Sequence, residues 1–245
     1  MNPIIIIPAR LASVRLPNKP LADIGGLPMI VHVMRRALQA EVGPVVVACG
    51  DRAIADAIET AGGKAVMTDP SLPSGSDRVF EALEVFDPDA SYDPIINLQG
   101  DLPTILPSVI GDVVKPLENK EVDIGTLAVK FRDLSEGREP NNVKVYAHLS
   151  SGKNIGRAQF FSRNLLPVTD WEPYQHVGVY AFRRDVLRQF VGLEESAMEQ
   201  QEKLEQLRAL EAGMRIDFAL VDTVPDGVDT PADLERIRSL LENSE

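Results

Sequence analysis

Short runs of apolar residues alternate along this chain with longer amphipathic segments. The clearest apolar runs are Ile4–Ile7, Val45–Cys49 and Ile95–Leu98, whereas Met29–Ala40, just after Pro28, is amphipathic. Runs of this length suit buried strands, and amphipathic segments suit helices that pack on a sheet. This alternation predicts an α/β domain.

The remaining segments continue the same pattern. We expect one domain over residues 1–245, because the sequence contains no repeat, low-complexity tract or flexible linker. The region from about 123 to 185 is less regular and is interpreted as an elaboration of that domain. Further strands are predicted at Val66–Thr68, Asp123–Phe131, Val143–Leu149, Val177–Phe182 and Ile216–Val221, and further helices at Ala53–Ala61, Asp77–Phe86, Ser108–Leu117, Asp185–Phe190, Met198–Ala212 and Thr230–Leu241.

Composition restricts the class of protein. The 245 residues are 44% apolar, which is ordinary for a globular chain with a sizeable core. The formal charge of −12 argues against broad affinity for nucleic acid or anionic membranes. Cys49 is the single cysteine, so no internal disulfide can form. The N-terminus lacks signal-peptide features, and no stretch approaches the roughly 18 apolar residues of a membrane span. We therefore expect a soluble cytoplasmic protein.

Several common catalytic fingerprints are missing from the sequence. There is no G-x-x-x-x-G-K-[ST] loop, no G-x-G-x-x-G loop and no G-x-S-x-G elbow. No histidine and cysteine residues have the spacing of zinc ligands. These absences weaken the P-loop, Rossmann dehydrogenase and common hydrolase interpretations.

A local excess of positive charge follows the first predicted strand. Residues 1–22 contain Arg10, Arg15 and Lys19 but no acidic residue, although the whole chain is acidic. Ligands of open α/β sheets bind beyond the carboxyl ends of strands, so a loop there with three cations and the Ser13 hydroxyl suits a triphosphate. The alternative is a solvated loop stiffened by proline.

Two aspartates are candidate metal ligands. Asp101 follows the apolar strand Ile95–Leu98, and Mg²⁺ takes one or two carboxylates while sharing its other positions with phosphates and water. A turn-forming aspartate is the alternative. Asp229 precedes a helix that Thr230 and Pro231 are suited to begin, so helix entry is its alternative explanation.

Two further elements are ambiguous. Glu199, Glu202 and Gln206 have the i, i+3, i+7 spacing of one helix face, which is more often a solvated surface than a binding site. His176 precedes an alternating strand, where a lone histidine is more often structural than catalytic.

Together, seven blocks resemble the CMP-Kdo synthetases, which are cytidylyltransferases that activate 3-deoxy-manno-octulosonate (Kdo). The blocks occur from end to end in the order of that family. Ser76, Leu102 and Phe161 depart from the usual residues, which affects fine substrate choice rather than the reaction. The blocks are Ile6–Leu21, Ser74–Arg78, Asn97–Pro103, Phe161–Arg163, His176–Tyr180, Leu204–Arg208 and Gly227–Pro231.

The resemblance implies a three-layer α/β/α nucleotide-diphosphosugar transferase fold with a mixed, mostly parallel sheet. It also implies a homodimer formed through the irregular middle region. The implied reaction joins CTP and Kdo to give CMP-Kdo and pyrophosphate for lipopolysaccharide biosynthesis, with Mg²⁺ as the cofactor.

The resemblance also assigns roles to individual residues. Nucleotide binding falls to Arg10, Ser13, Arg15, Lys19, Arg78 and Gln99, and metal binding to Asp101 and Asp229. Sugar binding falls to Gln99, Arg163, His176, Tyr180, Glu202 and Gln206. Arg10, Lys19 and Asp101 are the expected catalytic residues, because phosphoryl-type transfer depends on positioning and neutralisation of charge.

Three alternatives stay open at this point. The closest is the same chemistry on another ulosonic acid, such as 8-amino-Kdo or sialic acid. A second is a sugar-1-phosphate nucleotidyltransferase, in which a phosphate attacks instead of a hydroxyl. A third is a non-catalytic nucleotide-binding regulator, which predicts the loss of Lys19, Asp101 or Asp229, all of which are present.

Overall fold

The computed structural model describes residues 1–150, 152–167 and 170–242. The chain forms two compact units, one comprising Met1–Ile110 with Pro225–Glu245 and the other Gly111–Val224. The single cytidylyltransferase domain expected over residues 1–245 stays a prediction. No helix among the described residues has the length and apolarity needed to cross a membrane.

The first unit is built on a parallel sheet. Its strands β1 (Ile4–Ala9), β4 (Val45–Cys49), β5 (Ala65–Met67) and β6 (Ile95–Asn97) lie in the order β5-β4-β1-β6. Every residue of Ile4–Ile7 is fully buried, as expected for a parallel strand covered on both faces. The apolar runs in the sequence therefore form the core of this unit.

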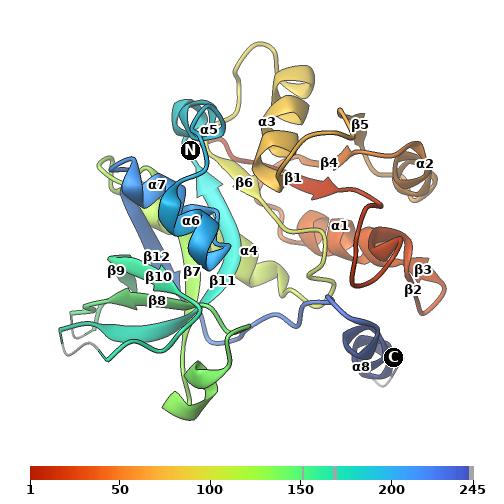
Figure 1. Ribbon diagram of the computed structural model, residues 1–245. Coiled ribbons are helices and arrows are strands. Elements are labelled where there is room, and N and C mark those ends of the chain that lie inside the picture. The colour runs from red at the N-terminus through yellow and green to blue at the C-terminus, as the bar shows by residue number, and fades with distance from the viewer. Residues whose placement is uncertain (151, 168–169, 243–245) are drawn as a thin grey trace. The chain divides into compact units, whose positions relative to one another are not determined.

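Helices cover both faces of this sheet (Figure 1). Helices α1 (Met29–Gln39) and α2 (Arg52–Thr60) pack against one face, and α3 (Gly75–Phe86) packs against the other. This gives the three layers expected of the fold.

The strand order creates a binding crevice by topology alone. From β1 the chain first adds β4 and β5 on one side and then returns to add β6 on the other side. At such a switch point the loops after neighbouring strands diverge and leave a crevice at their carboxyl ends. Here those loops begin at Arg10, after β1, and at Leu98, after β6.

A short hairpin was missed by the sequence analysis. Strands β2 (Asp23–Ile24) and β3 (Leu27–Pro28) pair through Gly25 and Gly26, whose φ angles are 58° and 81°. Two successive positive φ angles suit a tight hairpin turn and favour glycine at both positions. Helix α8 (Pro231–Glu242) packs against β2 and joins this region through a shared apolar core.

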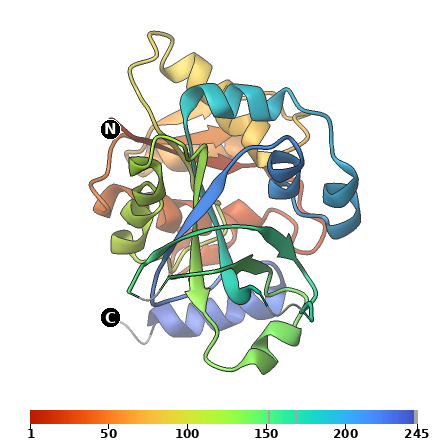
Figure 2. The same cartoon turned by 90° about the vertical axis from the view of Figure 1, so that its left-hand side faces the viewer.

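The second unit contains a mixed sheet (Figure 2). Parallel β7 (Ile124–Lys130) and β12 (Ile216–Leu220) lie between antiparallel β11 (Glu172–Phe182) and β9 (Ile155–Arg157). Two more antiparallel strands, β8 (Lys144–Ala147) and β10 (Phe160–Ser162), continue from β11. Strands β9 and β10 were not predicted, and β11 begins earlier than expected.

Two predicted helices are each divided in the structure. The segment Ser108–Leu117 forms α4 (Pro107–Asp112) and then a 3₁₀ turn, Lys115–Glu118, because Pro116 lacks the amide hydrogen that a continuing helix needs. The segment Met198–Ala212 forms α6 (Ala197–Glu202) and α7 (Gln206–Glu211). The remaining helix of this unit is α5 (Arg184–Val191), and a second 3₁₀ turn covers Leu134–Arg138.

Lys203 causes the break between α6 and α7. Its φ and ψ of 56° and 46° are left-handed, so the helical hydrogen-bond ladder stops there. Glu202 ends one helix and Gln206 begins the next. The expectation that these two side chains share one helix face was therefore wrong.

Candidate active site

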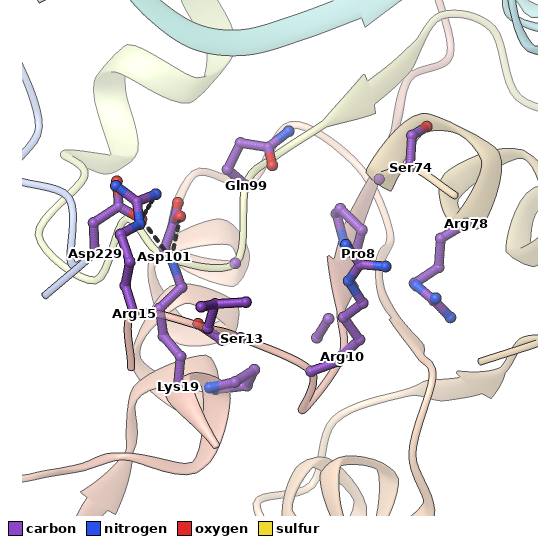
Figure 3. Close-up of a pocket in the computed structure, with 16 residues that line it drawn as sticks. Pro8, Arg10, Ser13, Arg15, Lys19, Ser74, Arg78, Gln99, Asp101 and Asp229 are labelled. Carbon is purple, nitrogen blue, oxygen red and sulfur yellow. Dashed lines mark hydrogen bonds and ion pairs between the residues drawn. The ribbon is translucent and has the colours of Figure 1, made fainter. Parts of the chain in front are cut away.

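A pocket of about 340 Å³ lies at the carboxyl ends of β1 and β6 in the first unit. Figure 3 shows Arg15, Asp101 and Asp229 on one side of it, and Arg10 and Arg78 on the other. All eight first-unit residues predicted from the sequence line this pocket: Arg10, Ser13, Arg15, Lys19, Arg78, Gln99, Asp101 and Asp229.

The loop after β1 is held in place by Asp51. This residue occupies the N-cap position of α2, but its side chain makes no capping hydrogen bond. Instead its Oδ2 accepts a hydrogen bond of 2.8 Å from the backbone nitrogen of Leu11. A side chain that usually caps a helix is thus used to fix the cationic loop. Asp51 was missed, although its position just after the strand Val45–Cys49 signals this edge of the sheet.

Lys19 lies between the two candidate metal ligands. Its Nζ donates to Asp101 Oδ2 at 2.7 Å and to Asp229 Oδ1 at 3.0 Å. Burial alone lowers the pKa of Lys19, but the two carboxylates outweigh burial and raise that pKa above its usual value. Lys19 is therefore a fixed positive charge at neutral pH.

The Asp229 carboxylate does not cap helix α8. Helix entry, the alternative explanation for this residue, therefore does not account for its side chain. Thr230 Oγ1 accepts from Asp233 N at 3.2 Å and donates to the Asp233 carboxylate at 2.8 Å, so this pair caps α8. Asp229 instead forms an ion pair with Arg15 Nη2 at 3.0 Å, in addition to its contact with Lys19. The backbone of Val228 donates to Asp101 O at 3.0 Å and ties the two aspartate segments together.

Arg78 forms the other end of the pocket. Its side chain is 2% exposed, and Nη1 donates to Thr68 Oγ1 at 2.6 Å and to Asp69 O at 3.1 Å. Nη2 is buried and has no hydrogen-bond partner among the described residues. Burial, followed by repulsion from Arg10, lowers the pKa of Arg78 below its usual value. Such a donor, in a pocket wall, suits an acceptor on a bound ligand.

Close backbone packing shapes the floor of the pocket. A Cβ atom at Gly100 would lie only 2.9 Å from the carbonyl oxygen of Pro8, so only glycine fits between β1 and the loop after β6. Gln99, the residue before it, donates from Nε2 to Asn97 Oδ1 at 3.2 Å. This contact holds the Gln99 amide at the pocket wall.

The donor set of Asp101 and Asp229 fits Mg²⁺. Both are carboxylates, the hard oxygen ligands that this ion prefers, and both already converge on one positive charge at Lys19. No cluster of three or more histidine, cysteine, aspartate or glutamate side chains suited to a metal occurs among residues 1–150, 152–167 and 170–242. Two carboxylates leave room for phosphate and water ligands, as Mg²⁺ in nucleotide sites requires.

Two of the predicted sugar-binding residues of the second unit contact each other. Arg163 donates from its backbone nitrogen to Glu202 Oε2, and from Nε to the Glu202 carbonyl oxygen, both at 2.8 Å. Its Nη2 also donates to the carbonyl oxygen of Lys203 at 3.2 Å. Arg163 and Glu202 therefore fasten the break between α6 and α7 to the strand β10.

The other three predicted residues of this unit form a second group. The rings of His176 and Tyr180 lie 5.5 Å apart, and Tyr180 and Gln206 line one cavity of about 10 Å³. Burial raises the pKa of Tyr180 well above its usual value, so the phenol stays protonated. The cavity is close to the size of one water molecule and is too small for a sugar.

Comparisons with known proteins agree with this geometry. Residues 4–216 match the cytidylyltransferase family. Proteins from Paramagnetospirillum magneticum and Methylorubrum extorquens, both named 3-deoxy-manno-octulosonate cytidylyltransferase, are each 56% identical to this chain. The alignments cover 98% of this chain and 98% and 97% of those proteins, respectively.

A solved structure adds to the sequence comparison. CMP:2-keto-3-deoxy-manno-octonic acid synthetase, complexed with CTP, superposes with a TM-score of 0.89 at 39% identity, and the match covers 100% of both chains. This likeness confirms the predicted α/β nucleotidyltransferase fold. By its sequence and its fold, the chain belongs to the 3-deoxy-manno-octulosonate cytidylyltransferases.

Proposed function

We propose that this enzyme transfers CMP from CTP to the anomeric hydroxyl of Kdo, releasing pyrophosphate, with Mg²⁺ as cofactor. The observation that carries the proposal is one pocket in which the cations of the loop after β1 face the carboxylates of Asp101 and Asp229. The 56% identity to named Kdo cytidylyltransferases supports the same substrates.

The cationic residues account for binding and activating the triphosphate. Negative charge accumulates on phosphate oxygens as the sugar hydroxyl attacks the α-phosphorus and pyrophosphate leaves. Arg10 binds phosphate oxygens through its planar fork of donors, and Lys19 neutralises charge as a point cation. Ser13 adds a hydroxyl and Arg15 a second guanidinium on the same loop. These groups lower the barrier by electrostatic stabilisation and positioning.

Asp101 and Asp229 would hold the metal. At that position Mg²⁺ would supply positive charge to phosphate oxygens and would lower the pKa of a nearby hydroxyl. With that chemistry supplied, no side chain of this chain would be needed as a dedicated general base. Lys19 keeps both carboxylates pointing into the pocket.

The nucleotide and the sugar use different residues. Arg78 offers its unpaired Nη2 donor to the nucleoside, and Gln99 offers its amide at the pocket wall. In the second unit, His176, Tyr180 and Gln206 are the residues that the family resemblance assigns to the sugar. Arg163 and Glu202 position that region by fixing the break between α6 and α7.

The decisive experiment measures pyrophosphate release from each nucleoside triphosphate with a panel of ulosonic acids and Mg²⁺. We expect release only when CTP, Kdo and Mg²⁺ are all present. Faster release with 8-amino-Kdo or sialic acid would reassign the sugar and leave the chemistry intact. Equal release with ATP, or with a hexose 1-phosphate, would overturn the proposal.

Three further parts of the proposal concern the setting of the reaction. The product supplies activated Kdo for lipopolysaccharide, and a cytoplasmic location suits a chain whose single cysteine is buried and unpaired. A homodimer through the irregular middle region, about 123–185, is supported by exposed apolar side chains there. Leu134, Ile155 and Trp171 are 58%, 41% and 39% exposed. Sedimentation equilibrium should give twice the 26.8 kDa chain mass.

A further inference from the structure

Thr126, on β7, is a fully buried residue to which the reaction assigns no role. Its hydroxyl contacts three groups of the neighbouring strand β11. Oγ1 lies 2.8 Å from the carbonyl oxygen of Val179, 3.3 Å from that of Val177 and 3.0 Å from His176 Nε2. The two carbonyl oxygens and the imidazole nitrogen around this hydroxyl decide where its proton lies.

A β-bulge brings these groups together. Val177 pairs with Leu127 and Tyr180 with Thr126, so Gly178 and Val179 are additional residues on β11. Bulges of this kind bend a strand locally and re-aim its side chains. Here the bulge turns two carbonyl oxygens of β11 toward the Thr126 hydroxyl and places the His176 ring beside it.

The lengths of these contacts indicate the histidine tautomer. A hydroxyl has one proton to donate, and a carbonyl oxygen can only accept. The contact to Val179 O, at 2.8 Å, is the shortest of the three, and it assigns the Thr126 proton to that carbonyl oxygen; toward His176, at 3.0 Å, the hydroxyl then acts as the acceptor. Nε2 of His176 must carry hydrogen to complete that contact.

The other ring nitrogen of His176 faces no protein partner. Nδ1 makes no hydrogen bond to any described residue, and His176 keeps a small exposed surface although most of it is buried. The ring is held edge-on by Phe161, with centroids 5.1 Å apart, and lies against Tyr180. Burial lowers the pKa of His176 to about 3, so the ring is neutral near pH 7 and Nδ1 has a free lone pair.

We propose that Thr126 is a positioning residue that locks His176 in the Nε2–H tautomer, so that Nδ1 accepts a hydrogen bond from a hydroxyl of the sugar substrate. The tautomer follows from the protein alone, whereas the bond to sugar rests on the proposed function. The locked tautomer distinguishes a sugar hydroxyl, which can donate, from groups that can only accept.

Nuclear magnetic resonance of the free protein tests the tautomer directly. In protein labelled with ¹⁵N-histidine, the chemical shifts of the ring nitrogens identify which one carries hydrogen. The chain has three histidines, and a His176→Asn sample assigns the His176 signals by their loss. We expect Nε2–H in the unaltered protein and in Thr126→Ser, and a mixture of tautomers in Thr126→Val. Nδ1–H in the unaltered protein, or an unchanged tautomer in Thr126→Val, would overturn the proposal.

Kinetics tests the link to the sugar. Thr126→Val is expected to raise KM for Kdo about fivefold, the equivalent of one hydrogen bond, with KM for CTP unchanged. Thr126→Ser should restore KM for Kdo. A second pair of variants does not depend on Thr126→Val folding. In His176→Asn the side-chain amide lies where Nδ1 was, and in His176→Gln it lies where Nε2 was. Because Nδ1 is the proposed sugar contact, His176→Asn should give a lower KM for Kdo than His176→Gln.

The outcomes separate the two proposals. If Gln gave the lower KM, Nδ1 would not be the sugar contact. If the unaltered protein released no pyrophosphate with Kdo, the proposed function would fail, while the spectrum would still decide the role of Thr126.

Discussion

Lys19 donates a hydrogen bond to Asp101 across 82 positions of sequence, with Nζ 2.7 Å from the carboxylate oxygen. The contact joins the loop after β1 to the loop after β6, which leave neighbouring strands at the same edge of the sheet. It places the positive charge of Lys19 directly beside the two carboxylates that suit the metal.

The first prediction concerns those carboxylates. Asp101→Asn and Asp229→Asn should each lower kcat at least about a hundredfold, because each removes an anionic ligand whose effect is largest in the transition state. Steady-state kinetics at saturating Mg²⁺ measures the effect, and circular dichroism checks the fold. Asp56→Asn, which removes only an exposed ion pair with Arg52, is the matched control. Near-normal turnover in Asp229→Asn would return that residue to a structural role.

The second prediction is that Lys19 acts on CTP and not on the sugar. Lys19→Ala should mainly impair the use of CTP, raising its KM at least about tenfold, because a charge-assisted hydrogen bond to phosphate is lost. The KM for Kdo should stay within about twofold. Each substrate is varied with the other saturating. Lys153→Ala, at an exposed lysine of the second unit, serves as the control. An equal rise in both KM values would contradict the assignment.

The sequence predicted the first unit well because its signals are local. Buried parallel strands appear as continuous apolar runs, and Val45–Cys49 has the predicted bounds in the structure. The cations around Lys19 line a pocket in the structure, because the loop after a strand at a switch point borders the crevice there. Asp229 could be placed beside Asp101 only through the family resemblance, since spacing carries no information across 128 residues.

The second unit was predicted less well because long-range contacts decide its structure. Amphipathic spacing suggested one helix over Met198–Ala212, and nothing local marks Lys203 as left-handed. Arg163 reaches across from the end of β10 and binds the Glu202 and Lys203 carbonyl oxygens there. Thr126 gave no signal either, because its role depends on a bulge in another strand.

The third prediction follows from the Glu202 contacts. Glu202→Ala should lower the free energy of unfolding by roughly 1–3 kcal/mol, because the partly buried backbone nitrogen of Arg163 and the Ser162 hydroxyl lose their acceptor. Urea denaturation measures this change. Gln201→Ala, on an exposed neighbouring residue, should change stability by less than about 0.5 kcal/mol. A loss of sugar binding in Glu202→Ala at full stability would instead make Glu202 a direct contact.

The fourth prediction concerns Gln206, which is 7% exposed and lines the small cavity beside Tyr180. Gln206→Ala should raise KM for Kdo several-fold with little change in KM for CTP, because one polar contact to a sugar is worth on the order of 1 kcal/mol. Gln201→Ala again provides the comparison. Unaltered kinetics in Gln206→Ala would show that the side chain only fills space in the fold.

The last prediction uses the pH dependence of stability. Burial holds the pKa of His176 at about 3 in the folded protein, against 6.5 for an unperturbed histidine. Between these values the unfolded chain binds a proton that the folded chain does not, so protonation favours unfolding. The neutral ring contributes its full stability above pH 6.5, and that stability is lost as pH falls toward 3. At about pH 5 the loss should be roughly 2 kcal/mol relative to about pH 8.

Other groups titrate over the same range, so the variant His176→Asn is needed to isolate the contribution of His176. Because asparagine does not titrate, the free energy of unfolding of the variant should fall less steeply between about pH 8 and pH 5 than that of the unaltered protein. The difference between the two slopes, measured by urea denaturation, gives the histidine term. Parallel curves would mean that His176 is protonated as readily in the folded chain as in the unfolded one.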